Sequence, residues 1–168
     1  VPSTAKWENT VPSAMTKYLD MGWVSQAEVQ AALLAEMGYT GDASILEGPH
    51  GFWRMYGSDR WEPEKITDKL GDKWFLPRKT IYKPYPCCRG MHGGLDCFIY
   101  LLEQHNLRHE EIERVVCLTD PIVDQHLWRS RKIVTHVDTQ FNAAYPFAAA
   151  AFRLLPGPSW QSNEALIN

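Results

Sequence analysis

The sequence predicts an α+β fold in which a partial all-helical segment is followed by a small α+β domain. In the N-terminal part, apolar residues recur at helical spacing. Beyond Asp72 the sequence becomes rich in aromatic and β-branched residues, which is typical of strands. Strand-like and helix-like stretches then alternate toward the C-terminus. This order indicates a helical part joined to an α+β part near residues 72–78.

Three helices are expected in the N-terminal part. Residues 21–37 place apolar side chains close to the i, i+3, i+4, i+7 spacing of one buried stripe. Asp42 can cap a second helix over residues 43–56. Pro63, whose fixed φ suits a first turn, begins a third helix over residues 63–71. These helices bury too little surface to stand alone, so we expect their packing partners to lie outside this chain.

The C-terminal part is expected to alternate strands and helices. Residues 74–76 and 80–82 read as short strands, and residues 112–119 as a longer one. A helix is expected over residues 92–105, where apolar residues share one face. The Ala-rich residues 142–155 predict the last helix, which ends at a cluster of Pro and Gly.

Composition limits the possible partners. The chain has 168 residues, 17 Lys and Arg against 20 Asp and Glu, and a net charge of -3. No basic stripe is present, so we expect no nucleic acid or membrane partner. The apolar runs are shorter than the ~18–20 residues of a membrane span. Four cysteines, two of them adjacent, favour a reducing compartment, cytoplasm or organelle matrix, over a disulfide framework. The chain starts at Val1 without a signal-peptide pattern, and we expect it to be a piece of a longer protein.

The densest cluster of reactive side chains lies in residues 83–92. Two prolines fix its backbone, which predicts a rigid exposed turn at a strand end. Lys83 and Arg89 offer cationic donors for carboxylates, and His92 can move a proton near neutral pH. The glycine-rich helix start offers backbone N–H groups to an anion. The segment therefore suits a small polycarboxylate, and the alternative is a stiff linker with solvated charges.

Metal and nucleotide chemistry are not expected. The spacing of Cys87, Cys88, His92 and Cys97 does not match a structural zinc site. A low-pKa nucleophilic cysteine at Cys87 or Cys88 stays an alternative. No phosphate loop or dinucleotide fingerprint is present, so no cofactor is expected. Lys17 lies ahead of the first clear helix, where a lysine could reach a cleft or simply lie on the surface.

Several blocks of sequence resemble the MmgE/PrpD family, which includes 2-methylcitrate dehydratase, cis-aconitate decarboxylase and iminodisuccinate epimerase. The blocks occur in the order typical of the family, which makes the resemblance more specific than any single block would. The resemblance runs from about residue 15 to residue 160. The blocks are residues 17–22, 31–41, 45–48 with Gly51 and Phe52, 83–89 with His92, and 141–148.

The resemblance implies a two-domain enzyme with its active site in a cleft between a large all-helical domain and a smaller α+β lid. Residues 1–76 would then be the C-terminal part of a helical-domain segment, and residues 77–168 the lid. Asp20 stands where the family commonly has a histidine, and Glu28 replaces a usual glycine. Cys88 lies where some members have a histidine. The departures leave the substrate class open, because a carboxylate at the cleft edge would repel a tricarboxylate.

The expected reaction is proton abstraction next to a carboxylate, most simply dehydration of a small di- or tricarboxylate, without a cofactor. Epimerisation, isomerisation or decarboxylation, and a non-catalytic interaction module, are the alternatives. By motif match the catalytic residues are Lys83, His92 and Lys17, and the substrate-binding residues are Arg89, Cys88 and Tyr85. We expect a homodimer or pairing with a complementary helical-domain chain, and negligible turnover by this chain alone.

Overall fold

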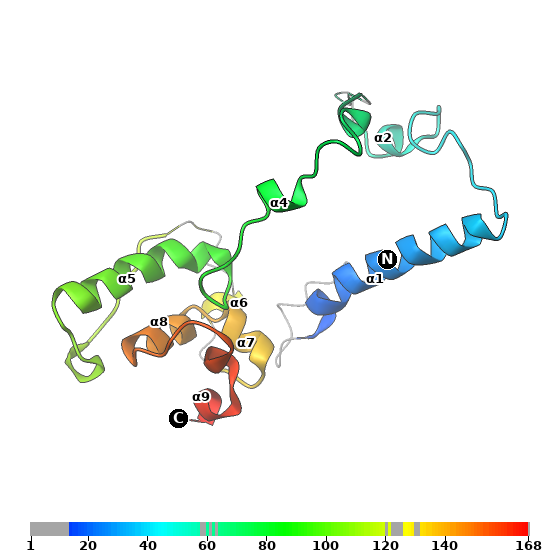
Figure 1. Cartoon of the computed structure of the whole chain (residues 1–168). Helices are drawn as coiled ribbons and strands as arrows, with labels where there is room; N and C mark the ends of the chain where they lie inside the picture. Colours follow the sequence, from blue (N-terminus) through cyan, green and yellow to red (C-terminus); the bar gives the residue numbers. More distant parts are fainter. Residues whose placement is uncertain are drawn as a thin grey trace. The chain divides into compact units, whose positions relative to one another are not determined.

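The structure is a computed structural model that describes residues 14–57, 60, 62, 64–119, 121, 126–129 and 132–167. Helices joined by turns and irregular segments make up this part of the chain (Figure 1). The α-helices are α1 (Thr16–Glu36), α2 (Phe52–Met55), α3 (Glu64–Thr67), α4 (Leu76–Lys79), α5 (His92–Gln104), α6 (His126–Arg129), α7 (His136–Phe141), α8 (Ala144–Ala151) and α9 (Asn163–Ile167). Single-turn 3-10 helices are η2 (Arg89–Met91), η3 (His109–Glu111) and η5 (Pro158–Gln161).

No strand occurs among the described residues, so the predicted α+β fold is wrong and this part of the chain is helical. The predicted strand over residues 112–119 is irregular, and Leu118 in it is 95% exposed. The residues predicted as strands at 74–76 and 80–82 flank or enter α4. Strand propensity reflects packing on a pleated surface, and a strand forms only beside a partner that takes its N–H and C=O groups. These segments have the propensity, but no neighbour pairs with them in the part of the chain that the structure describes.

Three predicted helices are confirmed. The helix expected over residues 21–37 is α1, which begins earlier than predicted. The helix expected over residues 92–105 is α5. The Ala-rich residues 142–155 contain α8, which ends at Ala151.

The helix predicted over residues 43–56 is wrong except for α2. Asp42 stabilises a local turn and caps no helix: its Oδ1 accepts from Ser44 N at 2.8 Å and from Ser44 Oγ at 2.7 Å. The chain then turns, since Pro49 has no N–H for a helical hydrogen bond. Only α3 forms within the third predicted helix, and Pro63, its expected first residue, lies outside the described residues.

The chain forms two compact units. Trp23–Ile81 make one, and the residues up to Gly22 together with residues 82–168 make the other. The division into residues 1–76 and 77–168 stays a prediction.

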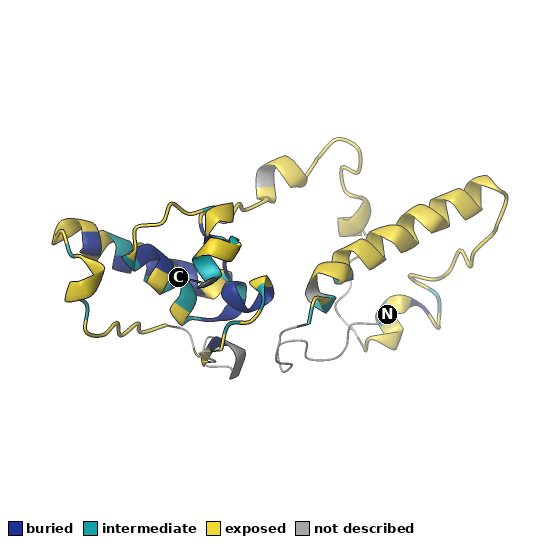
Figure 2. Ribbon diagram, turned by 90° about the horizontal axis from the view of Figure 1, so that it is seen from below, coloured by how far each residue is buried: buried dark blue, intermediate teal, exposed yellow. Residues whose placement is uncertain are grey.

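The unit that contains residues 82–168 has its core between α5, α7 and α8, where Figure 2 shows the buried residues. Leu95 and Leu102, seven residues apart on one face of α5, are both fully buried. Phe98 on the same face meets Phe147 of α8, with ring centroids 5.5 Å apart. The Asp138 carboxylate accepts from the backbone N of Thr135 at 2.8 Å, which caps the start of α7. This core fixes the helices that carry the candidate site.

The apolar residues of α1 do not form the buried stripe that their spacing predicts. Val29 and Leu33 are 60% and 54% exposed, and Met37, just after the helix, is 83% exposed. All residues of α1 from Met21 onward are exposed, which Figure 2 shows as a yellow ribbon. No helix within the described ranges is both long enough and apolar enough to span a membrane.

Candidate functional site

The candidate site is built on the turn at residues 84–88 and the helix start that follows it. Two hydrogen bonds fix the turn: Cys87 N donates to Tyr85 O at 2.8 Å, and Cys88 N donates to Gln140 O of α7 at 2.8 Å. Met91 N then donates to Cys88 O, which winds the chain into η2 and α5. The prolines explain why this segment is a turn, because neither can donate to a helix or a sheet.

Lys83 and His92 converge on one backbone carbonyl. Lys83 Nζ donates to Cys87 O at 3.2 Å, and His92 Nε2 lies 3.3 Å from the same oxygen. A carbonyl oxygen only accepts, so the proton of the neutral imidazole belongs on Nε2, and Nδ1 keeps its lone pair. The structure thus brings together two of the three predicted catalytic side chains.

His92 is buried, and this burial lowers its pKa below the ordinary 6.5. The positive charges of Lys83 and Arg89 lower the pKa further. The Cys87 carbonyl and the Asp96 carboxylate oppose these effects but do not reverse them. The ring is therefore neutral at pH 7, the state in which an imidazole can accept a proton.

The ring of Tyr85 is in contact with the ring of His92. Its ring is 8% exposed and meets His92 edge-on, with centroids 5.2 Å apart and ring planes at 88°. The ring of Tyr85 also stacks on the ring of Trp160, with centroids 5.9 Å apart. The hydroxyl donates to Asp96 Oδ1 at 2.6 Å. Burial, together with the Asp96 bond, raises the pKa of Tyr85 to about 12, so the hydroxyl stays protonated and donates.

The two neighbouring cysteines differ in environment. Cys87 is buried, and burial raises its pKa to about 12. Such a thiol is not a nucleophile near neutral pH, which removes one of the two cysteines considered from the sequence. Cys88 is half-buried and free of disulfide bonds. Within the part of the chain that the structure covers, no three His, Cys, Asp or Glu side chains gather as metal ligands would.

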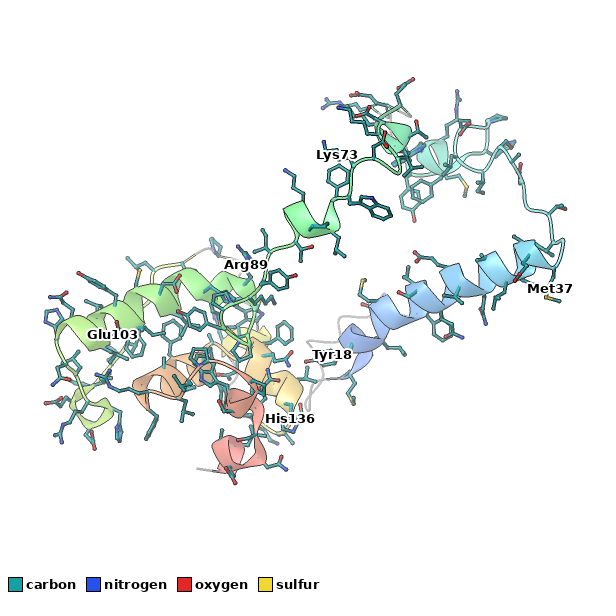
Figure 3. All side chains as sticks on the ribbon, viewed as in Figure 1. Tyr18, Met37, Lys73, Arg89, Glu103 and His136 are labelled. Atoms are coloured by element: carbon teal, nitrogen blue, oxygen red, sulfur yellow. The ribbon has the colours of Figure 1, made fainter. Side chains whose placement is uncertain are left out.

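The remaining predicted residues are Arg89 and Lys17. Arg89 is exposed in η2, at the turn that leads into α5 (Figure 3). Lys17 lies on α1, and its side chain is outside the described part of the structure. Its neighbour Tyr18 donates its hydroxyl to the Gln140 side chain. Since Gln140 also accepts from Cys88 N, the start of α1 and the turn meet at one residue of α7.

Three residues at the site were missed from the sequence. Asp96 comes four residues after His92, so helical spacing alone could have placed both on one face of α5. Trp160 and Gln161 come from η5, and Gln161 Nε2 donates to Pro86 O at 2.9 Å. No local signal connects η5 to the turn, because the two are far apart in sequence.

A helical C-terminal domain that carries a polar turn at the start of a buried helix matches a known class. Residues 85–165 match the family model described as MmgE/PrpD C-terminal domain. This match supports membership of the MmgE/PrpD family, whose members are generally lyases and isomerases. The resemblance seen in the sequence is thereby confirmed over residues 85–165. No curated protein and no solved structure matches the chain.

Proposed function

We propose that this chain is part of a cofactor-independent lyase, a dehydratase that acts on a small di- or tricarboxylate similar to 2-methylcitrate. The observation that carries the proposal is the convergence of Lys83 and His92 on one carbonyl at the start of α5. The family match supports the lyase or isomerase class. A cytoplasmic location, expected from the free cysteines, belongs to the same proposal.

The charges suit an anionic substrate. Lys83 and Arg89 are exposed cations within seven residues of each other, and the first turn of α5 carries no acidic side chain. The N–H groups of that turn and the helix dipole favour an anion there. In the proposal Lys83 exchanges its contact with Cys87 O for a substrate carboxylate, and Arg89 and Cys88 complete the binding surface. Lys17 supplies a further cation.

The reaction requires a base that takes a proton from the carbon next to a carboxylate. His92 fits this role because it is neutral at pH 7 and its Nδ1 keeps a lone pair. Lys83 stabilises the negative charge that develops on the substrate. Transfer of that proton from His92 to the departing hydroxyl completes a dehydration, whereas delivery of a proton to the other face of the carbon, by a second acid from a companion helical segment, gives an epimerisation. Loss of carbon dioxide is the third outcome, and product analysis separates the three.

A binding experiment tests the site without requiring turnover. The whole chain is titrated with citrate and followed by calorimetry, then compared with Lys83→Met, His92→Gln and the control Lys79→Met. Lys79 is an exposed lysine on α4, outside the turn. Loss of a charge-assisted hydrogen bond, about 1.5–3 kcal/mol, predicts roughly 10-fold to 100-fold weaker binding by Lys83→Met. The proposed site is wrong if Lys83→Met binds citrate as tightly as Lys79→Met does.

Turnover is measured separately by the appearance of a carbon–carbon double bond from a 2-methylcitrate-like substrate. Negligible turnover is expected from this chain alone, because the proposal requires a companion helical segment with further acid or base residues. A fully active monomer would show that the catalytic set is already complete in this sequence.

A further inference from the structure

We propose that Asp96 and Tyr85 are positioning residues that fix the imidazole of His92, with Asp96 holding the hydroxyl of Tyr85 and the Tyr85 ring holding the plane of the histidine. The inference deepens the proposed function and rests on it for its catalytic meaning. It assigns Tyr85 a role in holding the histidine in place of direct contact with substrate.

The first step is that Tyr85 cannot turn away from His92. Its ring is packed on Trp160, which is 1% exposed. At the far end of the ring, the hydroxyl donates to Asp96 at 2.6 Å. Gln161 also holds the carbonyl of Pro86, the next residue along the turn. The ring is therefore fixed at both ends by groups outside its own turn.

The second step is that the histidine needs this support. One hydrogen bond, from Nε2 to Cys87 O, still lets the imidazole swing about that contact. The edge-on ring of Tyr85, with its centroid 5.2 Å away, removes this freedom. Asp96 lies one turn after His92 on α5, so the anchor of the tyrosine and the histidine move as one helix. The result is a ring with a fixed Nδ1 direction.

Three variants separate the effect of the Tyr85–Asp96 hydrogen bond from the effect of the negative charge of Asp96. Tyr85→Phe removes the hydroxyl but keeps the ring and the carboxylate. Asp96→Asn removes the charge but keeps an oxygen that accepts from Tyr85. Asp96→Ala removes both the charge and the acceptor. Asp96 is exposed, so neither change at this position leaves a cavity in the core.

The test is the exchange of the His92 Nε2 proton with water, followed by 15N-edited NMR on the whole chain at a pH well above about 6.5, the ordinary histidine pKa. The reasoning predicts exchange roughly tenfold faster in Tyr85→Phe and Asp96→Ala, the factor that a charge-assisted hydrogen bond of ordinary strength contributes. Asp96→Asn should exchange at a rate between those of the unmodified chain and Asp96→Ala, because its neutral amide oxygen still accepts from Tyr85 in a weaker bond. The control Tyr100→Phe, an exposed tyrosine on the same helix, should exchange like the unmodified chain.

Two outcomes overturn the proposal: protection in Tyr85→Phe equal to that of the unmodified chain, or exchange in Asp96→Asn as fast as in Asp96→Ala. Thermal unfolding of each variant is measured alongside. It shows whether faster exchange in a variant comes from a general loss of stability. The NMR experiment uses no substrate, so it can succeed while citrate binding fails, or the reverse. Failure of the positioning role and failure of the proposed function are thus distinguishable.

Discussion

Two adjacent glycines in the first turn of α5 differ in what surrounds them. A Cβ built on Gly93 meets nothing within 4 Å. A Cβ built on Gly94 would lie 2.5 Å from Cys117 Sγ and 3.2 Å from Phe147 Cζ. We therefore expect Gly94→Ala to lower the free energy of unfolding and Gly93→Ala to raise it.

The magnitude follows from two opposed effects. Replacing glycine by alanine in a helix stabilises by roughly 0.5–1 kcal/mol. Overpacking costs about 1–3 kcal/mol, and only Gly94 incurs it. Since both glycines lie in one helical turn, the helix effect cancels when the two variants are compared. The expected difference between Gly93→Ala and Gly94→Ala is the overpacking cost itself, about 1–3 kcal/mol.

Urea unfolding of the whole chain, followed by circular dichroism, measures this difference. Adding Cys117→Ala to Gly94→Ala removes the sulfur, and the remaining Cβ of residue 117 is 3.9 Å away, an ordinary contact. This second change should recover stability that Cys117→Ala alone does not add, a coupling that a double-mutant cycle detects. Equal stability of the two glycine variants would refute the reasoning, because it would mean that residue 117 does not pack on α5.

Two further results are expected. Light scattering should show association of the chain through the exposed apolar residues of α1. The double variant Val29→Lys with Leu33→Lys should reduce this association, whereas the control Gln30→Lys should not. A chain that is monomeric at all concentrations contradicts this prediction. The Cys87 thiol has a pKa of about 12 when folded against 9.0 as the ordinary value, so its contribution to stability is fully present below pH 9 and is lost as pH rises toward 12. Urea midpoints should fall less steeply over this range in Cys87→Ala, and an identical slope would contradict the pKa assignment.

Local pattern was sufficient for several features. The helices α1, α5 and α8 follow from residues close in sequence, because an α-helix makes its hydrogen bonds between residues four apart. The family resemblance followed from blocks of sequence in a fixed order, and the family model matches the part at residues 85–165. The reactive turn was visible because its prolines are incompatible with a helix or a sheet.

The irregular residues 112–119 show where local pattern failed. Their β-branched residues have the propensity for a strand, yet among the described residues no strand is formed. A strand depends on a partner elsewhere in the chain, and propensity contains no information about whether one is present. The same limit applied to the stripe of α1, whose spacing predicted burial while its side chains are exposed.

The sequence by itself determined the helices α1, α5 and α8, the family resemblance and the residue types of the turn. Only the tertiary structure decided which of those residues meet: Lys83 and His92 at the Cys87 carbonyl, Tyr85 between His92 and Trp160, and Asp96 as its anchor. The physical reason is the distance in sequence between the residues that interact. Helical hydrogen bonds join neighbours in sequence, whereas the stacking of Trp160 on Tyr85 joins residues brought together only when α5, α7 and α8 form a common core.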